Sequence, residues 1–259
     1  MRTPTLQVSG VYSDLKHRGI IKLSGRDQNK FLQNLLSNDI EKLKPDELQY
    51  SLLLSPQGKV LYDFFVFKLQ GDICLDCNKA YAEEIIKRLY MHKLHSNIDI
   101  ALQPEISVYI SNDRLTQSFY PDPRNINLGF RGYTANTSEL TTFTMNSDLL
   151  GLYEEKRLVF LVPEFGVDFM PGEFWALELG MDKLNAISFQ KGCYIGQEVT
   201  ARMNYRGTNK KQLSNISLQN FVIKDRELFQ DSKKVGLILK KYNKTALALI
   251  KNNSTPKSN

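Results

Sequence analysis

The stretch Lys191-Gly192-Cys193-Tyr194-Ile195-Gly196-Gln197-Glu198 places a cysteine between two glycines, with a lysine before it and a carboxylate after it. Glycine permits backbone angles that other residues resist, so the chain can turn sharply on either side of the thiol. A thiol acts as nucleophile or metal ligand in its thiolate form, which a nearby cation such as Lys191 favours. Two interpretations follow: Cys193 is presented for thiol chemistry with Lys191 as its partner, or it is a buried thiol in a turn.

Composition bounds the class of protein. The chain has 259 residues, of which 42% are hydrophobic and 24% charged, as in globular proteins. No run of eighteen apolar residues is present, and Met1-Arg2-Thr3-Pro4 lacks the apolar core of a secretory signal. Three cysteines are too few for a disulfide framework, so we expect a cytoplasmic protein. The net charge of +6 favours anionic partners, such as nucleic acid, only weakly.

Hydrophobic periodicity predicts an α+β protein. Apolar residues at helical spacing predict helices near 27–36, at 80–94 and at 174–184. Strand patterns occur at 20–23, 48–54, 59–69, 73–77, 98–102, 106–110 and 158–162. The turn Ser55-Pro56-Gln57-Gly58 joins two of these strands into a hairpin.

The pattern of hydrophobic residues changes after Lys211. Short alternating segments at 213–218, 221–223, 234–239 and 245–250 predict a small all-β unit, which we interpret as a barrel. We therefore divide the chain into residues 1–205, with two packed lobes, a barrel at 206–251, and a polar tail at 252–259 that we expect to be disordered.

Two charged residues stand out beside apolar strands. Asp63 lies within the apolar run 59–69, where an ionised carboxylate needs a partner or a ligand. It either binds a ligand or accepts structural hydrogen bonds from a neighbouring loop. Arg157 precedes the apolar Leu158-Val159-Phe160, and a guanidinium group suits a carboxylate ligand. A surface arginine is the alternative.

Other candidate groups give weaker signals. Cys74 and Cys77 form a C-x-x-C without a second pair, and His92 and His95 lack an obvious carboxylate partner, so we expect no metal site. A basic patch follows the central stretch and consists of Arg202, Arg206, Lys210 and Lys211, with Tyr205 among them. It is a solvated linker, an anion site near Cys193, or an RNA contact in which the tyrosine stacks on a base.

The central stretch, followed by Arg202, Tyr205-Arg206-Gly207 and Lys210-Lys211, resembles the signature of the YgfZ family. Members of that family are folate-binding relatives of the glycine-cleavage T-protein and are implicated in iron–sulfur protein maturation. The resemblance extends weakly from about Leu6 to about Ile250. It implies a T-protein-like folate-binding α+β lobe, built from discontinuous segments, with a small C-terminal β-barrel.

The resemblance also implies a site and a function. Tetrahydrofolate would meet Asp63 at its pterin end and Arg157 at its glutamate tail, with Tyr194 among the cofactor-binding residues. The pocket would lie between these regions, with Cys193 at its mouth or on the adjacent surface. The implied function is a tetrahydrofolate-binding accessory protein that supports assembly or repair of iron–sulfur enzymes, including those that modify tRNA. Its partners would be iron–sulfur client or assembly proteins and tRNA.

Two further functions stay open from the sequence. One is an aminomethyltransferase of the glycine cleavage system, although Tyr62 replaces the first of two acidic residues in the T-protein pattern. The other is a tRNA-binding module that uses the basic patch.

Overall fold

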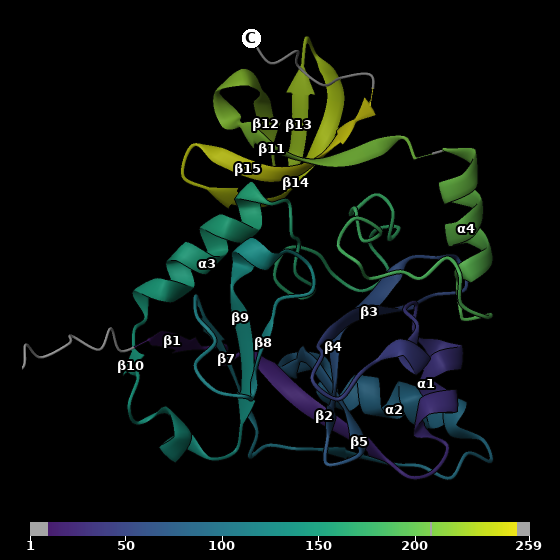
Figure 1. Ribbon diagram of the computed structural model, residues 1–259. Helices are drawn as coiled ribbons and strands as arrows, with labels where there is room; N and C mark the ends of the chain where they lie inside the picture. The colour runs from purple at the N-terminus through teal and green to yellow at the C-terminus, as the bar shows by residue number, and fades with distance from the viewer. Residues whose placement is uncertain (1–9, 208, 253–259) are drawn as a thin grey trace, which may run out of the picture.

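The computed structural model describes residues 10–207 and 209–252, and three five-stranded sheets organise this part of the chain (Figure 1). The first sheet has the order β3 (Gln49–Leu54), β4 (Val60–Leu69), β5 (Asp72–Asn78), β2 (Arg18–Ser24) and β6 (Asp99–Leu102). The second has the order β10 (Thr144–Met145), β1 (Val11–Asp14), β7 (Ser107–Ser111), β9 (Phe130–Thr134) and β8 (Phe119–Pro121). The C-terminal sheet has the order β11 (Lys211–Ser217), β15 (Thr245–Lys251), β14 (Lys233–Tyr242), β13 (Glu227–Gln230) and β12 (Val222–Lys224).

Helices connect and cover these sheets. The α-helices of the described residues are α1 (Gln28–Leu35), α2 (Ala82–Lys93), α3 (Asp148–Val159) and α4 (Gln197–Arg206). Short 3-10 helices lie at Ile40–Lys42, Lys79–Tyr81, Ile126–Leu128, Thr137–Leu140 and Leu218–Asn220. In Figure 1, α1 and α2 lie beside the first sheet, and α3 runs from the second sheet towards the C-terminal sheet. No helix in the described ranges is long and apolar enough to cross a membrane.

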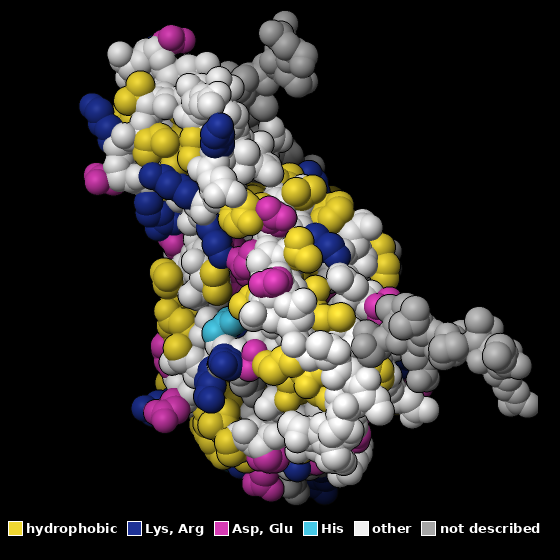
Figure 2. Space-filling view, turned by 90° about the vertical axis from the view of Figure 1, so that its left-hand side faces the viewer, with side chains coloured by type: hydrophobic (Ala, Val, Ile, Leu, Met, Phe, Trp, Pro, Cys, Tyr) yellow, Lys and Arg dark blue, Asp and Glu magenta, His cyan; other side chains and the backbone are white. Residues whose placement is uncertain are grey.

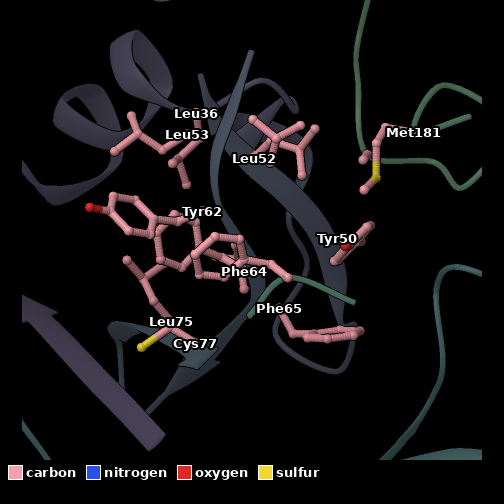
Figure 3. Packing of buried hydrophobic residues seen from close by; sticks show 14 of the residues in the cluster. Leu36, Tyr50, Leu52, Leu53, Tyr62, Phe64, Phe65, Leu75, Cys77 and Met181 are labelled. Atoms are coloured by element: carbon pink, nitrogen blue, oxygen red, sulfur yellow. The ribbon is translucent and has the colours of Figure 1, made fainter. Parts of the chain in front are cut away.

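The β3–β4 hairpin forms one side of the first sheet, with β3 at the edge and β4 next to it. Its turn closes through a hydrogen bond from the Gly58 N–H to the Ser55 carbonyl, 2.8 Å long, with Gly58 at a φ of +76°. Alternate residues of a strand face opposite sides. Figure 3 accordingly shows Tyr50 and Phe65 together on one side of the hairpin, with Tyr62 and Phe64 on the other. β4 lies between β3 and β5, and buried residues face both of its sides.

Buried ion pairs join the first two sheets. Arg18 of β2 donates to Asp76 of β5 at 2.6 Å and to Asp63 of β4 at 3.1 Å. Across the junction, Arg131 of β9 donates to the same Asp76 at 2.9 Å. The Arg131 guanidinium also lies 3.8 Å from the centre of the Phe65 ring. The two sheets therefore meet through charges that have no exposed side-chain surface and compensate one another.

The C-terminal sheet contacts the rest of the chain through apolar and polar groups. Its contribution to the main hydrophobic core includes Leu213, Leu239, Leu247 and Leu249. Lys240 pairs with Glu154 of α3, Tyr242 donates to Glu155 at 3.0 Å, and Arg226 pairs with Glu173 at 3.0 Å. Figure 2 shows basic side chains on this upper lobe facing acidic ones below it. The described residues contain no ladder between the edge strands β11 and β12, so this unit is an open sheet and the predicted barrel is not shown.

Two predicted elements are wrong. The strand predicted at 158–162 belongs instead to α3 and the turn after it, because Arg157 and Leu158 are buried on the inner face of that helix. The helix predicted at 174–184 is a series of turns. Gly172 and Gly180 adopt positive φ, and the Phe174 carbonyl accepts a bond from Val60 of the hairpin at 3.0 Å. These contacts satisfy the backbone of the segment outside a helix.

We expect Arg18→Met to destabilise the fold severely, because it leaves the buried Asp63 without its cation and Asp76 with Arg131 alone. Breaking a buried pair in this way costs roughly 3–5 kcal/mol. Chemical denaturation of both proteins measures the difference in free energy of unfolding. The control is Lys16→Met, which removes a lysine whose side chain is 84% exposed and should leave the midpoint unchanged. A fully stable Arg18→Met protein would contradict this description of the junction.

Candidate functional site

The loop that carries Cys193 lies between the turns of the 160–190 segment and helix α4. Cys193 is exposed, whereas Cys74 and Cys77 are buried in β5. Burial raises the pKa of both β5 thiols to about 12. Cys193 is therefore the accessible thiol of the described residues, and of the two interpretations of this cysteine the structure favours presentation at the surface.

Lys191 anchors the loop on the side before the thiol. Its ammonium donates to the backbone carbonyls of Gln33, Leu36 and Asn38, at 2.6, 2.7 and 2.8 Å. These carbonyls lie at the C-terminal end of α1, where carbonyl groups lack partners within the helix. An ammonium has three N–H donors, and these three acceptors use all of them. The Lys191 side chain thus points to α1, which corrects the expectation that it serves as the cation of the Cys193 thiol.

Gly196 and Gln197 anchor the loop on the side after the thiol. Gly196 has a φ of +83°, and a Cβ atom there would lie 2.5 Å from the Ser55 carbonyl oxygen. Only glycine permits this approach to the hairpin turn. The Gln197 side chain contacts the carbonyls of Lys191 and Gly192, each at 3.4 Å. The two glycines that the sequence places around the thiol therefore differ, since Gly192 faces open space.

Tyr194 is part of the core. Its ring lies 5.2 Å from the Lys191 ammonium nitrogen, and only 7% of the residue is exposed. Burial raises the pKa of its hydroxyl to about 12. The hydroxyl finds no hydrogen-bond partner in the described residues. Tyr194 therefore packs in the core under the loop. This position differs from the prediction that Tyr194 binds the cofactor.

Asp63 is saturated by internal partners. One carboxylate oxygen accepts from Arg18, and the other accepts from the Tyr50 hydroxyl at 3.0 Å and from the Phe165 N–H at 3.4 Å. The sequence left two interpretations of Asp63 open, a ligand-binding group or an acceptor of structural hydrogen bonds from a neighbouring loop. The bond from the Phe165 N–H is of the second kind. Both oxygens of this carboxylate are engaged inside the protein, and the side chain has no exposed surface.

Arg157 is also engaged. It donates to Asp168 at 2.7 Å, to Glu154 at 2.8 Å and to the Val162 carbonyl at 2.9 Å. Although burial opposes the charged form, Asp168, Glu164 and Glu154 hold the pKa of Arg157 above its ordinary value. Its side chain is fully buried, so it is neither a surface arginine nor available to a carboxylate ligand.

A cavity of about 330 Å³ lies elsewhere than the predicted pocket. It is bounded by the 160–184 segment, α4 and β11, with Arg124, Phe160, Leu177, Asp182, Asn204 and Leu213 among its lining residues. Asp63, Arg157 and Cys193 do not line it. The Nη1 atom of Arg124 is buried without a hydrogen-bond partner in the described part of the chain. Sequence reasoning missed Arg124, whose only signal was a charged residue between prolines and asparagines in a predicted loop.

The predicted basic patch is partly neutralised. Arg202 lies 3.9 Å from Glu198 on α4, and Lys211 pairs with Glu178 at 3.3 Å. Arg206 and Lys210 remain exposed and form no ion pair among the described residues. Tyr205 is 76% exposed beside them. Within residues 10–207 and 209–252, no group of three or more His, Cys, Asp or Glu side chains is placed to hold a metal ion.

Comparison with protein families supports the T-protein relationship. The family model for the GCVT N-terminal domain matches residues 6–105. Among solved structures, the glycine cleavage system aminomethyltransferase T from Bartonella henselae superimposes with a TM-score of 0.72, covering 94% of this chain and 78% of that chain. The sequence identity is 14%, so this likeness concerns the fold. The predicted T-protein-like fold is confirmed.

Curated relatives come from fungi and animals. The chain is 29% identical over 223 residues to the iron-sulfur cluster assembly factor IBA57 homolog, mitochondrial, of Mycosarcoma maydis, covering 78% of this chain and 55% of that protein. It is 26% identical over 238 residues to the human iron-sulfur cluster assembly factor IBA57, mitochondrial, covering 81% and 67%. The chain thus spans between about half and two thirds of the length of these relatives. It carries a T-protein-like fold, and the curated proteins that it resembles are iron–sulfur cluster assembly factors.

Proposed function

We propose that this protein is an accessory factor for the assembly or repair of iron–sulfur enzymes, and that it acts through the Cys193 thiol. The observation that carries the proposal is the exposed thiol on a loop anchored by buried Lys191 and Tyr194. Anchoring on both sides limits the conformational freedom that binding would otherwise cost. The names of the curated relatives support the same process.

One cysteine cannot hold a cluster alone, because clusters usually take four protein ligands. The cluster is therefore cargo that a partner protein brings and holds with its own ligands. We propose that Cys193 contacts that cargo transiently. The partners are iron–sulfur assembly or client proteins, as the relatives' names support. We keep the cytoplasm as the compartment expected from cysteine usage, while the relatives' names specify mitochondria.

Tetrahydrofolate belongs to the proposal through the cavity beside α4. The residues first predicted to hold it, Asp63 and Arg157, do not fit, because both are internally paired. The cavity has the size of a small-molecule site and combines apolar walls with a few polar groups. The unpartnered Arg124 nitrogen calls for an acceptor, which folate carbonyl or carboxylate oxygens supply. Arg124 and Asp182 would hold this carrier of one-carbon units.

The other candidate functions have less support. Similarity to the aminomethyltransferase concerns the fold, and its acidic position falls on an engaged Asp63, so we do not propose aminomethyl transfer. Contact with tRNA, and membership of the YgfZ family in particular, stay predictions from the sequence. The exposed Arg206 and Lys210 are where a tRNA phosphate would bind.

Replacing the thiol should abolish the function without unfolding the protein. In cells deprived of their own assembly factor of this type, the wild-type chain should restore the activity of iron–sulfur enzymes. Cys193→Ser should leave that activity at the level of the empty vector, because serine is a poor ligand for cluster iron. Cys74→Ala removes a buried thiol and should restore activity like wild type. Full restoration by Cys193→Ser would contradict the proposal.

Tetrahydrofolate binding can be tested separately by calorimetric titration. We expect saturable heat with wild type and with Glu198→Trp, and strongly reduced heat with Asn204→Trp. Both positions are exposed on α4, but only Asn204 lines the cavity, so only the second substitution fills it. Absence of saturable heat with wild type would withdraw tetrahydrofolate and leave the thiol function untouched.

A further inference from the structure

The C-terminal end of α1 lacks a cation of its own. The helix has no basic residue in its last turn, although the last carbonyls of a helix carry a partial negative charge. The positive group is supplied by Lys191, which lies more than 150 residues later in the chain. Its Nζ atom meets three carbonyls at 2.6 to 2.8 Å. This end of α1 is thus completed by the segment that carries the exposed thiol.

The residues on either side of Cys193 are held, while the thiol is free. Lys191 and Tyr194 are only 8% and 7% exposed, and the lysine ammonium lies above the tyrosine ring. Gly192 and Cys193 between them are exposed. A Cβ atom on Gly192 would meet nothing within 4 Å, and its carbonyl meets the Gln197 side chain at 3.4 Å. The three contacts of the Lys191 ammonium, at 2.6 to 2.8 Å, are shorter and hold the loop on the N-terminal side of the thiol.

We propose that Lys191 is the positioning residue for Cys193: its ammonium fixes the thiol-bearing loop onto the C-terminal end of α1. This inference deepens the proposed function, because a thiol that shares a cluster with a partner must be held in one place. It assigns to Lys191 a mechanical role through three carbonyl contacts. The alternative role, a cation that stabilises the thiolate, requires the ammonium to leave those carbonyls.

The restraint depends on the positive charge and the three donors of one group. The last carbonyls of a helix carry a partial negative charge, and the Lys191 Nζ atom meets three carbonyls at 2.6 to 2.8 Å. A side chain without an N–H group, such as methionine, offers these carbonyls no donor. Removing the ammonium should therefore loosen the loop.

The test is electron paramagnetic resonance of a nitroxide label attached to Cys193 in the full chain. We expect an immobilised spectrum for wild type. Lys191→Met should give a mobile spectrum, because methionine offers the three carbonyls no donor. Lys191→Arg should keep most of the immobilised component, because a guanidinium group restores the charge and the N–H donors.

Matched controls separate this result from a general loss of structure. Lys30→Met removes an exposed lysine from α1 itself and should give the wild-type spectrum, and circular dichroism checks that each variant is folded. A wild-type spectrum in folded Lys191→Met would overturn the proposal. If that variant does not fold, Lys191→Gln takes its place, because an amide has two N–H donors for three carbonyls, and a wild-type spectrum in folded Lys191→Gln overturns the proposal. The measurement needs no cluster, so its failure is distinct from failure of the proposed function.

Discussion

The junction between the first two sheets depends on complete pairing of buried charges. Asp63 and Asp76 have no exposed side-chain surface, and together they are compensated by Arg18 and Arg131. Buried charges are tolerated only when each has its partner, so this network cannot release a carboxylate without losing the junction. The consequence for function is direct. Asp63, the acid for which the sequence resemblance predicts contact with folate, is part of the structural frame in this chain. The proposed chemistry therefore lies elsewhere on the same scaffold.

A similar pairing rule operates around the thiol. The carbonyls at the end of α1 and the ammonium of Lys191 satisfy each other, and Gly196 brings the same loop against the hairpin turn. The frame is buried, whereas the sulfur of Cys193 is exposed. Such an arrangement suits a ligand that is offered to a partner and does not suit a nucleophile enclosed with its substrate. The names of the relatives, iron–sulfur cluster assembly factors, support a role in which an exposed sulfur on a rigid frame meets a partner.

The sequence pattern predicted those features of the fold that depend on residues close together in the chain. Alternation along 48–69 correctly indicated a hairpin with Asp63 inside it, and burial required that acid to have partners. The identity of Arg18 as a partner, 45 residues earlier, depends on how strands pair and has no local signal. Apolar spacing at 174–184 suggested a helix, but Gly180 and a hydrogen bond to the hairpin override that preference. Lys191 was assigned to the thiol because it is close in sequence, whereas its side chain points to α1. Closeness in sequence does not show where a side chain points. The glycines and the cysteine could therefore be recognised as an exposed-thiol motif, whereas the role of Lys191 could not be predicted.

The central claim is that Cys193 contacts the iron–sulfur cargo itself. Alkylation of this cysteine, followed by mass spectrometry, tests it most directly when the protein is mixed with a carrier protein in cluster-loaded or cluster-free form. The account predicts that the cluster-loaded carrier slows Cys193 alkylation strongly, while the cluster-free carrier at the same concentration does not. Equal alkylation rates with both forms of the carrier would contradict it.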